Sequence, residues 1–127
     1  MKIKVSRKKD YRELMARNLV TSLILHENIT TTPTKAKIAE SLFARLITNT
    51  KTADLNAKKN SRKVLLDNNA SKKLFEVIIP RLMNEYGNTS TVRLNNRLGD
   101  NAPQVRLSIL LKPLKIEAKE KNIKEDK

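Results

Sequence analysis

Apolar side chains recur every three or four residues over the first half of the chain, which is the spacing of helices with one buried face. The segment 9–25 predicts a first helix, because four of its apolar residues are four positions apart: Tyr11, Met15, Leu19 and Leu23. Thr32-Pro33 predicts the start of a second helix, since threonine can cap a first turn and proline is tolerated at its first position. The apolar face of this helix is expected to carry five residues: Ala39, Leu42, Phe43, Leu46 and Ile47.

The middle of the chain is less regular. Residues 51–63 carry five cations and few apolar side chains, which favours a connector or a weak short helix over residues 55–66. Asn68 or Asn69 can cap a further helix. Pro80 lies inside that helix and predicts a kink or break just before it, because proline removes a hydrogen bond. The apolar face of this helix is expected to carry Leu74, Phe75, Ile78, Leu82, Met83 and Tyr86.

Two faces alternate in the segment 91–98, as in a strand with one buried side. Val92 and Leu94 are expected on the buried face. The opposite, exposed face is expected to carry three polar residues: Arg93, Asn95 and Arg97. The β-branched residues of segment 28–32 predict a shorter strand earlier in the chain.

The segment 104–111 alternates in the same way, with four residues expected in the core: Val105, Leu107, Ile109 and Leu111. Residues 99–103 between the last two strands are turn-forming, so an antiparallel hairpin is expected. The element order is then α-β-α-α-α-β-β. This order is typical of an α+β domain with one layer of helices and one of strands.

Composition adds that the chain is strongly basic. Its 127 residues include 27 Lys and Arg against 13 Asp and Glu, a formal net charge of +14. Such an excess repels itself in isolation and is relieved by a polyanion, of which nucleic acid is the first candidate. No stretch approaches the ~18 apolar residues of a membrane span, and the N-terminus lacks the apolar run of a secretory signal. A cytoplasmic protein without a membrane partner is therefore expected.

Charge also divides the chain into three parts. Residues 1–10 form a basic arm, residues 11–111 a single domain, and residues 112–127 a lysine- and glutamate-rich tail that is expected to be solvated or frayed. All four aromatic residues lie at helical spacing among aliphatic neighbours, which favours a place in the core. Recognition is then expected to use phosphates and RNA shape rather than base stacking.

Three groups of polar side chains are candidate nucleic-acid contacts. The arm and first helix can order on RNA, or the arm can stay solvated, and they supply Lys2, Lys4, Arg7, Lys8, Lys9, Arg12 and Arg17. The middle segment is either a phosphate contact or a solvated connector and supplies Lys51, Lys58, Lys59, Arg62 and Lys63. The exposed strand face either binds phosphates and 2′-hydroxyls or simply faces solvent, and supplies Arg93, Asn95 and Arg97.

Catalytic chemistry has little support in the sequence. His26 is the only histidine and lies beside Glu27 at a helix end, where capping or packing is favoured over catalysis. Gly87 and Gly99 are the only glycines, which excludes a glycine-rich phosphate loop. With no cysteine in the chain, we expect no enzyme, no metal, no cofactor and no small-molecule substrate.

Nine short motifs match a known family in the same order. They are Arg17-Asn18-Leu19, Thr21-Ser22-Leu23, His26-Glu27, Thr31-Thr32, Lys35-Ala36-Lys37, Leu46-Ile47-Thr48, Lys73-Leu74-Phe75, Pro80-Arg81 and the turn Arg97-Leu98-Gly99-Asp100-Asn101-Ala102-Pro103. Each motif alone is weak, but nine in order are specific. From about Arg7 to Leu111, the chain resembles the bacterial large-subunit ribosomal protein family L-seventeen.

The resemblance implies a structural constituent of the large ribosomal subunit that binds 23S-type rRNA beside neighbouring large-subunit proteins. It places such a protein on the solvent side, near the nascent-chain exit. It also implies a two-layer α/β fold in which a small mixed three-stranded sheet pairs the short first strand with the C-terminal hairpin. The chain departs from the family pattern in its shortened arm, at Ile79, where the family has glycine, and at Asn88, the place of a second glycine.

A basic DNA-binding nucleoid or regulatory protein stays open as the alternative. Such a protein would present a recognition helix with several exposed Asn, Gln and Arg side chains in register for base edges. None of the expected helices offers this pattern. The sequence therefore favours a ribosomal protein that binds RNA mainly through its phosphates.

Overall fold

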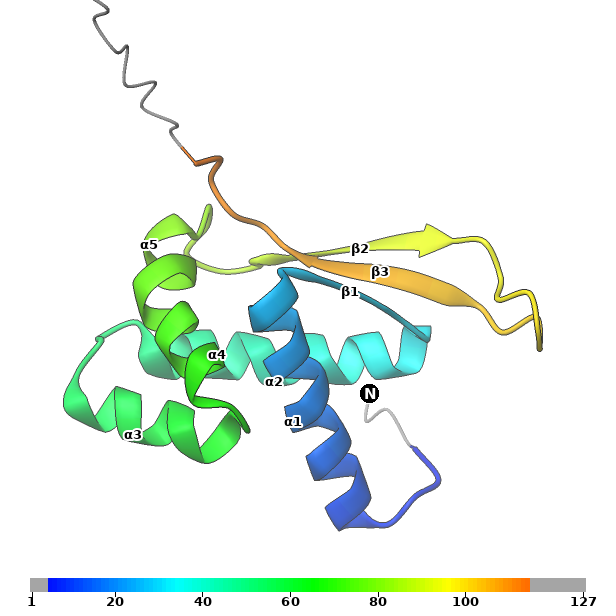
Figure 1. Cartoon of the computed structure of the whole chain (residues 1–127), viewed down its shortest axis with the longest axis horizontal. Coiled ribbons are helices and arrows are strands. Elements are labelled where there is room, and N and C mark those ends of the chain that lie inside the picture. The colour runs from blue at the N-terminus through cyan, green and yellow to red at the C-terminus, as the bar shows by residue number, and fades with distance from the viewer. Residues whose placement is uncertain (1–4, 115–127) are drawn as a thin grey trace, which may run out of the picture.

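A layer of helices supports a small sheet in the computed structural model, which describes residues 5–114 (Figure 1). The elements are α1 (Lys9–His26), β1 (Asn28–Thr31), α2 (Pro33–Thr50), α3 (Leu55–Val64), α4 (Asn68–Lys73), a π-helical turn (Leu74–Ile78), α5 (Ile79–Arg81), β2 (Thr89–Leu94) and β3 (Gln104–Ile109). The predicted two-layer α+β fold and its element order are confirmed, with the last predicted helix divided into three pieces.

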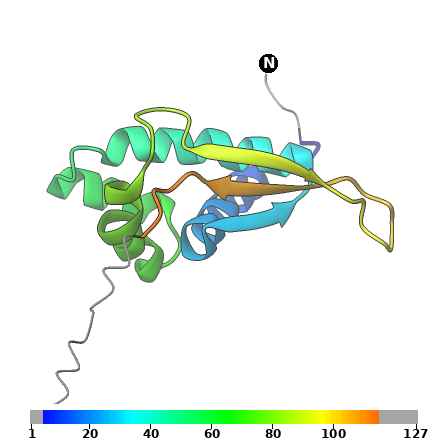
Figure 2. The ribbon, with the colours of Figure 1, turned by 90° about the horizontal axis from the view of Figure 1, so that it is seen from above.

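The sheet is antiparallel throughout. Its strand order is β1-β3-β2, and β3 runs opposite to both neighbours, so the mixed sheet that the resemblance implied is wrong. The expected hairpin of β2 and β3 is confirmed, as is the pairing of β1 with it. The loop between β2 and β3, residues 95–103, projects beyond the helices (Figure 2).

The core lies between β3 and the helices. Val105, Leu107 and Ile109 alternate along β3 and are buried, as predicted. Opposite them lie fully buried side chains of α1, of α2 and of the segment from α4 to the π-helical turn: Val20, Leu23, Ile24, Phe43, Leu74 and Ile78. The apolar face predicted for α2 is confirmed, since four of its five residues are buried and Leu42 is partly buried. Of the four spaced residues of α1, only Leu23 is buried, while Met15 and Leu19 are partly buried and Tyr11 is exposed.

The face of β2 that points away from the helices was predicted incorrectly. Directly paired residues of an antiparallel sheet share a face, and Arg93 is paired with Val105, whose side chain is buried. Arg93 thus lies on the helix side, at an end of the strand that the helices leave exposed, whereas Val92 lies on the outer side and is 54% exposed. The strand ends at Leu94, so Asn95 and Arg97 belong to the hairpin loop instead of the sheet.

The prediction that all four aromatic residues are buried holds only for the phenylalanines. Phe43 is buried and Phe75 packs against the core, but Tyr11 is 48% and Tyr86 71% exposed. Tyr11 lies in the first turn of α1, and Tyr86 lies beyond Arg81, the last residue of α5. Each tyrosine ring lies under a cation, with the Arg7 guanidinium carbon 5.6 Å from one centroid and Lys51 Nζ 4.3 Å from the other.

Local interactions explain where the middle helices begin and bend. The Asp67 carboxylate accepts a hydrogen bond from the Asn69 amide and caps α4, so the expected cap at Asn68 or Asn69 lies one or two residues too late. The expected distortion before Pro80 is confirmed as the π-helical turn, since proline has no N–H to continue an α-helical ladder.

The ends of the chain are described only in part. α1 begins at Lys9, so the last two residues of the predicted arm are helical, while Lys2 and Lys4 lie outside the described residues. Arg81 donates to the Lys112 carbonyl at 3.0 and 3.2 Å, which holds the chain as far as that residue. The expected frayed tail lies outside the described residues from residue 115 onward.

Replacing Leu107 and Val92 by alanine tests the orientation of the sheet. Leu107→Ala leaves a cavity in the core and lowers the free energy of unfolding by about 2–5 kcal/mol. Val92→Ala changes an exposed side chain and lowers it by at most about 1 kcal/mol. Urea denaturation followed by circular dichroism measures both, and a larger loss for Val92→Ala would contradict the register.

Candidate nucleic-acid interface

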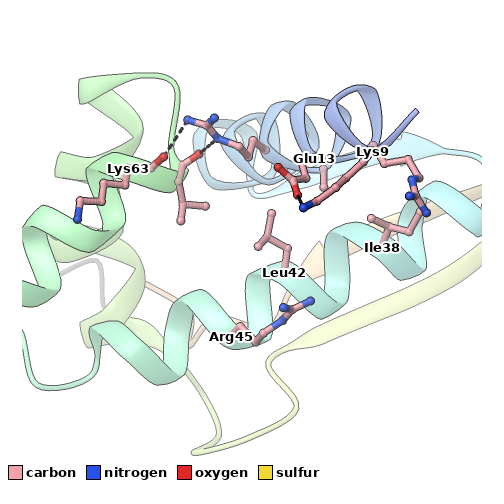
Figure 3. Close-up of a pocket in the computed structure, with 10 residues that line it drawn as sticks. Lys9, Glu13, Ile38, Leu42, Arg45 and Lys63 are labelled. Atoms are coloured by element: carbon pink, nitrogen blue, oxygen red, sulfur yellow. Dashed lines mark hydrogen bonds and ion pairs between the residues drawn. The ribbon is translucent and has the colours of Figure 1, made fainter. Parts of the chain in front are cut away.

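A cleft of about 720 Å³ lies between α1 and α2 and is bounded at one end by the last turn of α3 (Figure 3). Ten residues line it: Lys9, Arg12, Glu13, Ala16, Arg17, Ile38, Leu42, Arg45, Lys63 and Val64. Five of them are cations and one is an anion. The cleft is therefore suited to an anionic ligand.

Helical spacing explains why these residues meet. The five residues from α1 lie 0, 3, 4, 7 and 8 positions from Lys9, and Ile38, Leu42 and Arg45 follow the same rule on α2. Charged side chains form the edge of the cleft, which we call the rim: Lys9, Arg12, Arg17, Arg45 and Lys63, with Glu13. Apolar side chains form its base, which we call the floor: Ala16, Ile38, Leu42 and Val64.

Arg17 joins two walls of the cleft. Its Nε donates to the Val64 carbonyl and one terminal nitrogen to the Lys63 carbonyl, both at 2.8 Å. These carbonyls belong to the last turn of α3, where intrahelical partners are lacking. The predicted phosphate contact of Arg17 thus competes with an internal role, because its guanidinium already holds α3 against α1.

Arg12, Arg45 and Lys63 provide the remaining positive charge of the rim. Within residues 5–114, none of the three forms a salt bridge, whereas Lys9 lies 3.8 Å from the Glu13 carboxylate. The Arg12 Nε is buried and finds no hydrogen-bond partner in that part of the chain. A buried donor without an acceptor costs about 1–3 kcal/mol, so an acceptor at this point would be favourable.

The structure brings only some of the predicted contacts into the cleft. From the arm and first helix it gathers Lys9, Arg12 and Arg17, while Arg7 and Lys8 are exposed before α1. From the middle segment it gathers Lys63. The other predicted cations of α3, which are exposed and lie outside the cleft, are Lys58, Lys59 and Arg62.

Lys51 has partners within the chain. Its ammonium donates to the Glu85 carbonyl at 2.6 Å, lies 3.9 Å from the carboxylate of the same residue and covers the Tyr86 ring. Lys51 thus anchors the connector between α5 and β2 to the end of α2. Lys58 likewise lies over a ring, 6.0 Å from the centroid of Phe75.

Of the three polar residues predicted on the strand, Asn95 and Arg97 line one shallow hollow at the hairpin loop, and Arg93 does not. Arg93 lies on β2, and Asn95 follows the strand. Arg97 is paired with Asp100 inside the hairpin loop, where its Nε donates at 2.9 Å. Hydrogen bonds from Arg97 and from the Ala102 amide hold the pKa of Asp100 well below its usual range.

Arg45 is the rim residue that the sequence pattern did not reveal. It lies on the exposed side of α2, next to the apolar face that was predicted. The spacing of Ile38, Leu42 and Arg45 could have revealed that Arg45 belongs to the rim. This spacing puts the cation one turn beyond two partly exposed apolar residues on the same face of α2.

Other kinds of site find no support in the described part of the chain. Residues 5–114 contain no group of three or more His, Asp or Glu side chains that could hold a metal ion. None of the helices described is long and apolar enough to cross a membrane.

These features define a small, strongly basic α+β domain with a cationic cleft. The chain belongs to the ribosomal protein L17 family, whose sequence model matches residues 15–110. This result confirms the resemblance found in the motifs, and the family gives the chain a structural ribosomal role.

Relatives from several bacteria support this assignment. The chain is 44% identical over 108 residues to the large ribosomal subunit protein bL17 of Syntrophotalea carbinolica, covering 84% of this chain and 70% of that protein. It is 41% identical over 102 residues to the protein of the same name from Desulforudis audaxviator, covering 80% and 91%. For the one from Thermoanaerobacter sp., identity is 37% over 108 residues, covering 84% and 96%.

Replacing Arg17 by alanine tests its role between α1 and α3. The variant loses two charge-assisted hydrogen bonds, and its free energy of unfolding is expected to fall by about 1.5–3 kcal/mol. Arg45→Ala removes the same charge from the opposite wall and changes stability by about 0.5 kcal/mol or less. Denaturant titrations of both variants measure the difference, and equal losses would show that Arg17 does not hold α3.

The pair of Arg97 and Asp100 predicts a pH dependence of the hairpin loop. Because the pKa of Asp100 is lower in the folded than in the unfolded state, the pair stabilises the loop above about pH 3.9. That stabilisation is lost only as the pH falls through the lower, folded value. Carbon NMR of the Asp100 carboxyl between pH 2 and 6 should show a midpoint well below 4, moving up toward that value in Arg97→Gln. A wild-type midpoint near 4 would contradict the pairing.

Proposed function

We propose that the chain is a structural constituent of the large ribosomal subunit that binds and stabilises 23S-type rRNA. In this proposal it acts in the cytoplasm, as part of the ribosome and beside neighbouring large-subunit proteins. The observation that carries the proposal is the cleft, which is lined by five cations from α1, α2 and α3 and by only one carboxylate. Relatives that are named as large-subunit proteins support the choice of subunit.

Phosphate neutralisation gives this cleft its affinity. Arg12, Arg45 and Lys63 repel one another in the free protein, and a polyanion removes that cost while releasing its own counterions. Arginine adds geometry, because its planar guanidinium donates two parallel hydrogen bonds to one phosphate. The cleft therefore suits a folded RNA whose backbone phosphates converge from more than one side.

Further cations extend the interface beyond the cleft. The basic arm, including Lys2 and Lys4, and the exposed side chains of α3 supply additional phosphate contacts in this proposal. Arg17 holds α3 against α1, so the exposed cations of α3 and the cations of the rim approach the same RNA in this proposal. In this proposal the protein lies on the solvent side of the subunit, near the nascent-chain exit, as the family resemblance implies.

Neutralising the rim tests the proposal. A variant in which Arg12, Arg45 and Lys63 are replaced by glutamine should bind purified 23S-type rRNA more weakly. Its plot of log affinity against log salt concentration should be flatter by about 0.7–0.9 for each phosphate that the variant no longer neutralises. Filter binding over a salt series measures affinity and slope, and sucrose-gradient sedimentation shows how much of the variant travels with the large subunit.

A charge-matched variant is the control. Replacing three exposed cations outside the cleft by glutamine removes the same charge from other surfaces: Lys37, Lys72 and Arg106. Equal losses in the two variants would mean that total charge, and not the cleft, determines affinity. Equally tight binding to duplex DNA at high salt would favour the DNA-binding alternative instead.

A further inference from the structure

We propose that the cleft between α1 and α2 binds one unpaired RNA nucleotide, with its base on the floor and its phosphates on the rim. This inference rests on the proposed function and adds the kind of RNA that is recognised. It predicts preference for a bulged or looped-out nucleotide over a continuous duplex.

The floor provides an apolar surface that phosphates cannot use. Ile38 and Leu42 point from α2 into the space between the two helices (Figure 3). Ala16 of α1 lines the same cleft. Ala16 is the smallest residue on the face of α1 that lines the cleft. Arg12 and Glu13 lie one turn before it and Arg17 directly after it, and all three have longer side chains. The short side chain of Ala16 leaves room above the floor of the cleft.

The rim surrounds this surface with cations from three elements. Arg12 belongs to α1, Arg45 to α2 and Lys63 to α3, so a ligand on the floor has positive charge on several sides. Arg12 lines the cleft, and its buried Nε has no acceptor within residues 5–114. A phosphate oxygen or a base carbonyl supplies such an acceptor.

A nucleotide carries both an anionic phosphate, which suits the cationic rim, and a flat base with apolar faces, which suits the floor. The cleft volume of about 720 Å³ falls within the roughly 300–1,000 Å³ of pockets that enclose small ligands. In an A-form duplex the bases are stacked and their edges lie in grooves, so only an unstacked base can reach the floor. An unpaired base leaves the stack at the lowest cost. An acidic peptide matches the rim but brings no apolar group to the floor.

Three RNA hairpins of identical stem test the proposal with the full-length protein. One carries a single bulged 2-aminopurine, one an abasic nucleotide at the same bulge, and one no bulge. The base-bearing bulge should bind at least about fivefold more tightly than the abasic bulge, which is the gain expected from burying roughly 40 Å² of apolar base surface against aliphatic side chains. The 2-aminopurine fluorescence should change on binding as the base moves to the floor.

Matched substitutions separate the floor from the rim. Ile38→Ser should reduce the preference for the base-bearing bulge over the abasic bulge to about twofold or less and should lower the affinity for the base-bearing bulge itself, because it removes apolar surface from the floor. Leu55→Ser makes the same kind of change, from a branched aliphatic side chain to a hydroxyl, at an exposed position of α3 and should alter neither value. Arg45→Gln should weaken binding to all three hairpins by a similar factor, because all three present phosphates.

Three different results would overturn the proposal. Equal affinity for the base-bearing and abasic bulges, with salt-dependent binding that still requires the rim, would remove the nucleotide site and leave the proposed function intact. Displacement of the RNA by an equimolar glutamate-rich peptide would assign the cleft to protein. Absence of binding to any hairpin and to 23S-type rRNA would refute the proposed function as well.

Discussion

The cleft depends on the hydrogen bonds of Arg17. Its guanidinium binds the last two carbonyls of α3, and this brings Lys63 and Val64 to a helix that precedes them by more than forty residues. These bonds act together with a hydrogen bond from the Leu66 amide to the Thr21 hydroxyl and with the buried side chains of Ala57 and Leu65, which also hold α3 and its end in place. The bonds of Arg17 also satisfy carbonyls that a helix end otherwise leaves to water. In the proposed function Arg17 therefore acts indirectly, by positioning other cations.

Several carboxylates of the domain are used internally, which concentrates positive charge where they are absent. Glu27 ends α1 with a left-handed backbone, and its carboxylate lies 3.2 Å from Lys73 Nζ and 3.8 Å from an Arg81 nitrogen. Glu40 accepts from the Thr89 hydroxyl, and Asp100 is taken up by the hairpin loop. The contacts of Glu27 and Glu40 join the helices to one another and to the sheet. In the cleft, by contrast, Glu13 alone faces five cations.

Local patterns were enough to predict the elements α1, α2 and β3, and in α2 and β3 the periodicity also identified the buried face. The orientation of β2 could not be obtained in this way. Half-buried strands acquire their inner face from the register with a partner, and a shift of one residue inverts it. Val92 was expected inside because it is apolar, but it pairs with Arg106 on the outer face. Tyr86 was expected inside because it continues a helical stripe that in fact ends five residues earlier, at Arg81.

The site was harder to predict than the fold, because its residues meet only after the helices pack. Arg12 and Lys63 were identified as cations, yet nothing local indicates that they share a cleft, and Arg45 on the opposite wall was missed. The apolar floor was hidden by the same pattern that revealed the core, since Leu42 belongs to the apolar stripe of α2 and also lines the cleft. Phosphate contacts position a protein on RNA but do not distinguish one site from another. In the proposed nucleotide site the apolar floor beneath the cations supplies this discrimination, because only an RNA that offers an unpaired base can place that base on it.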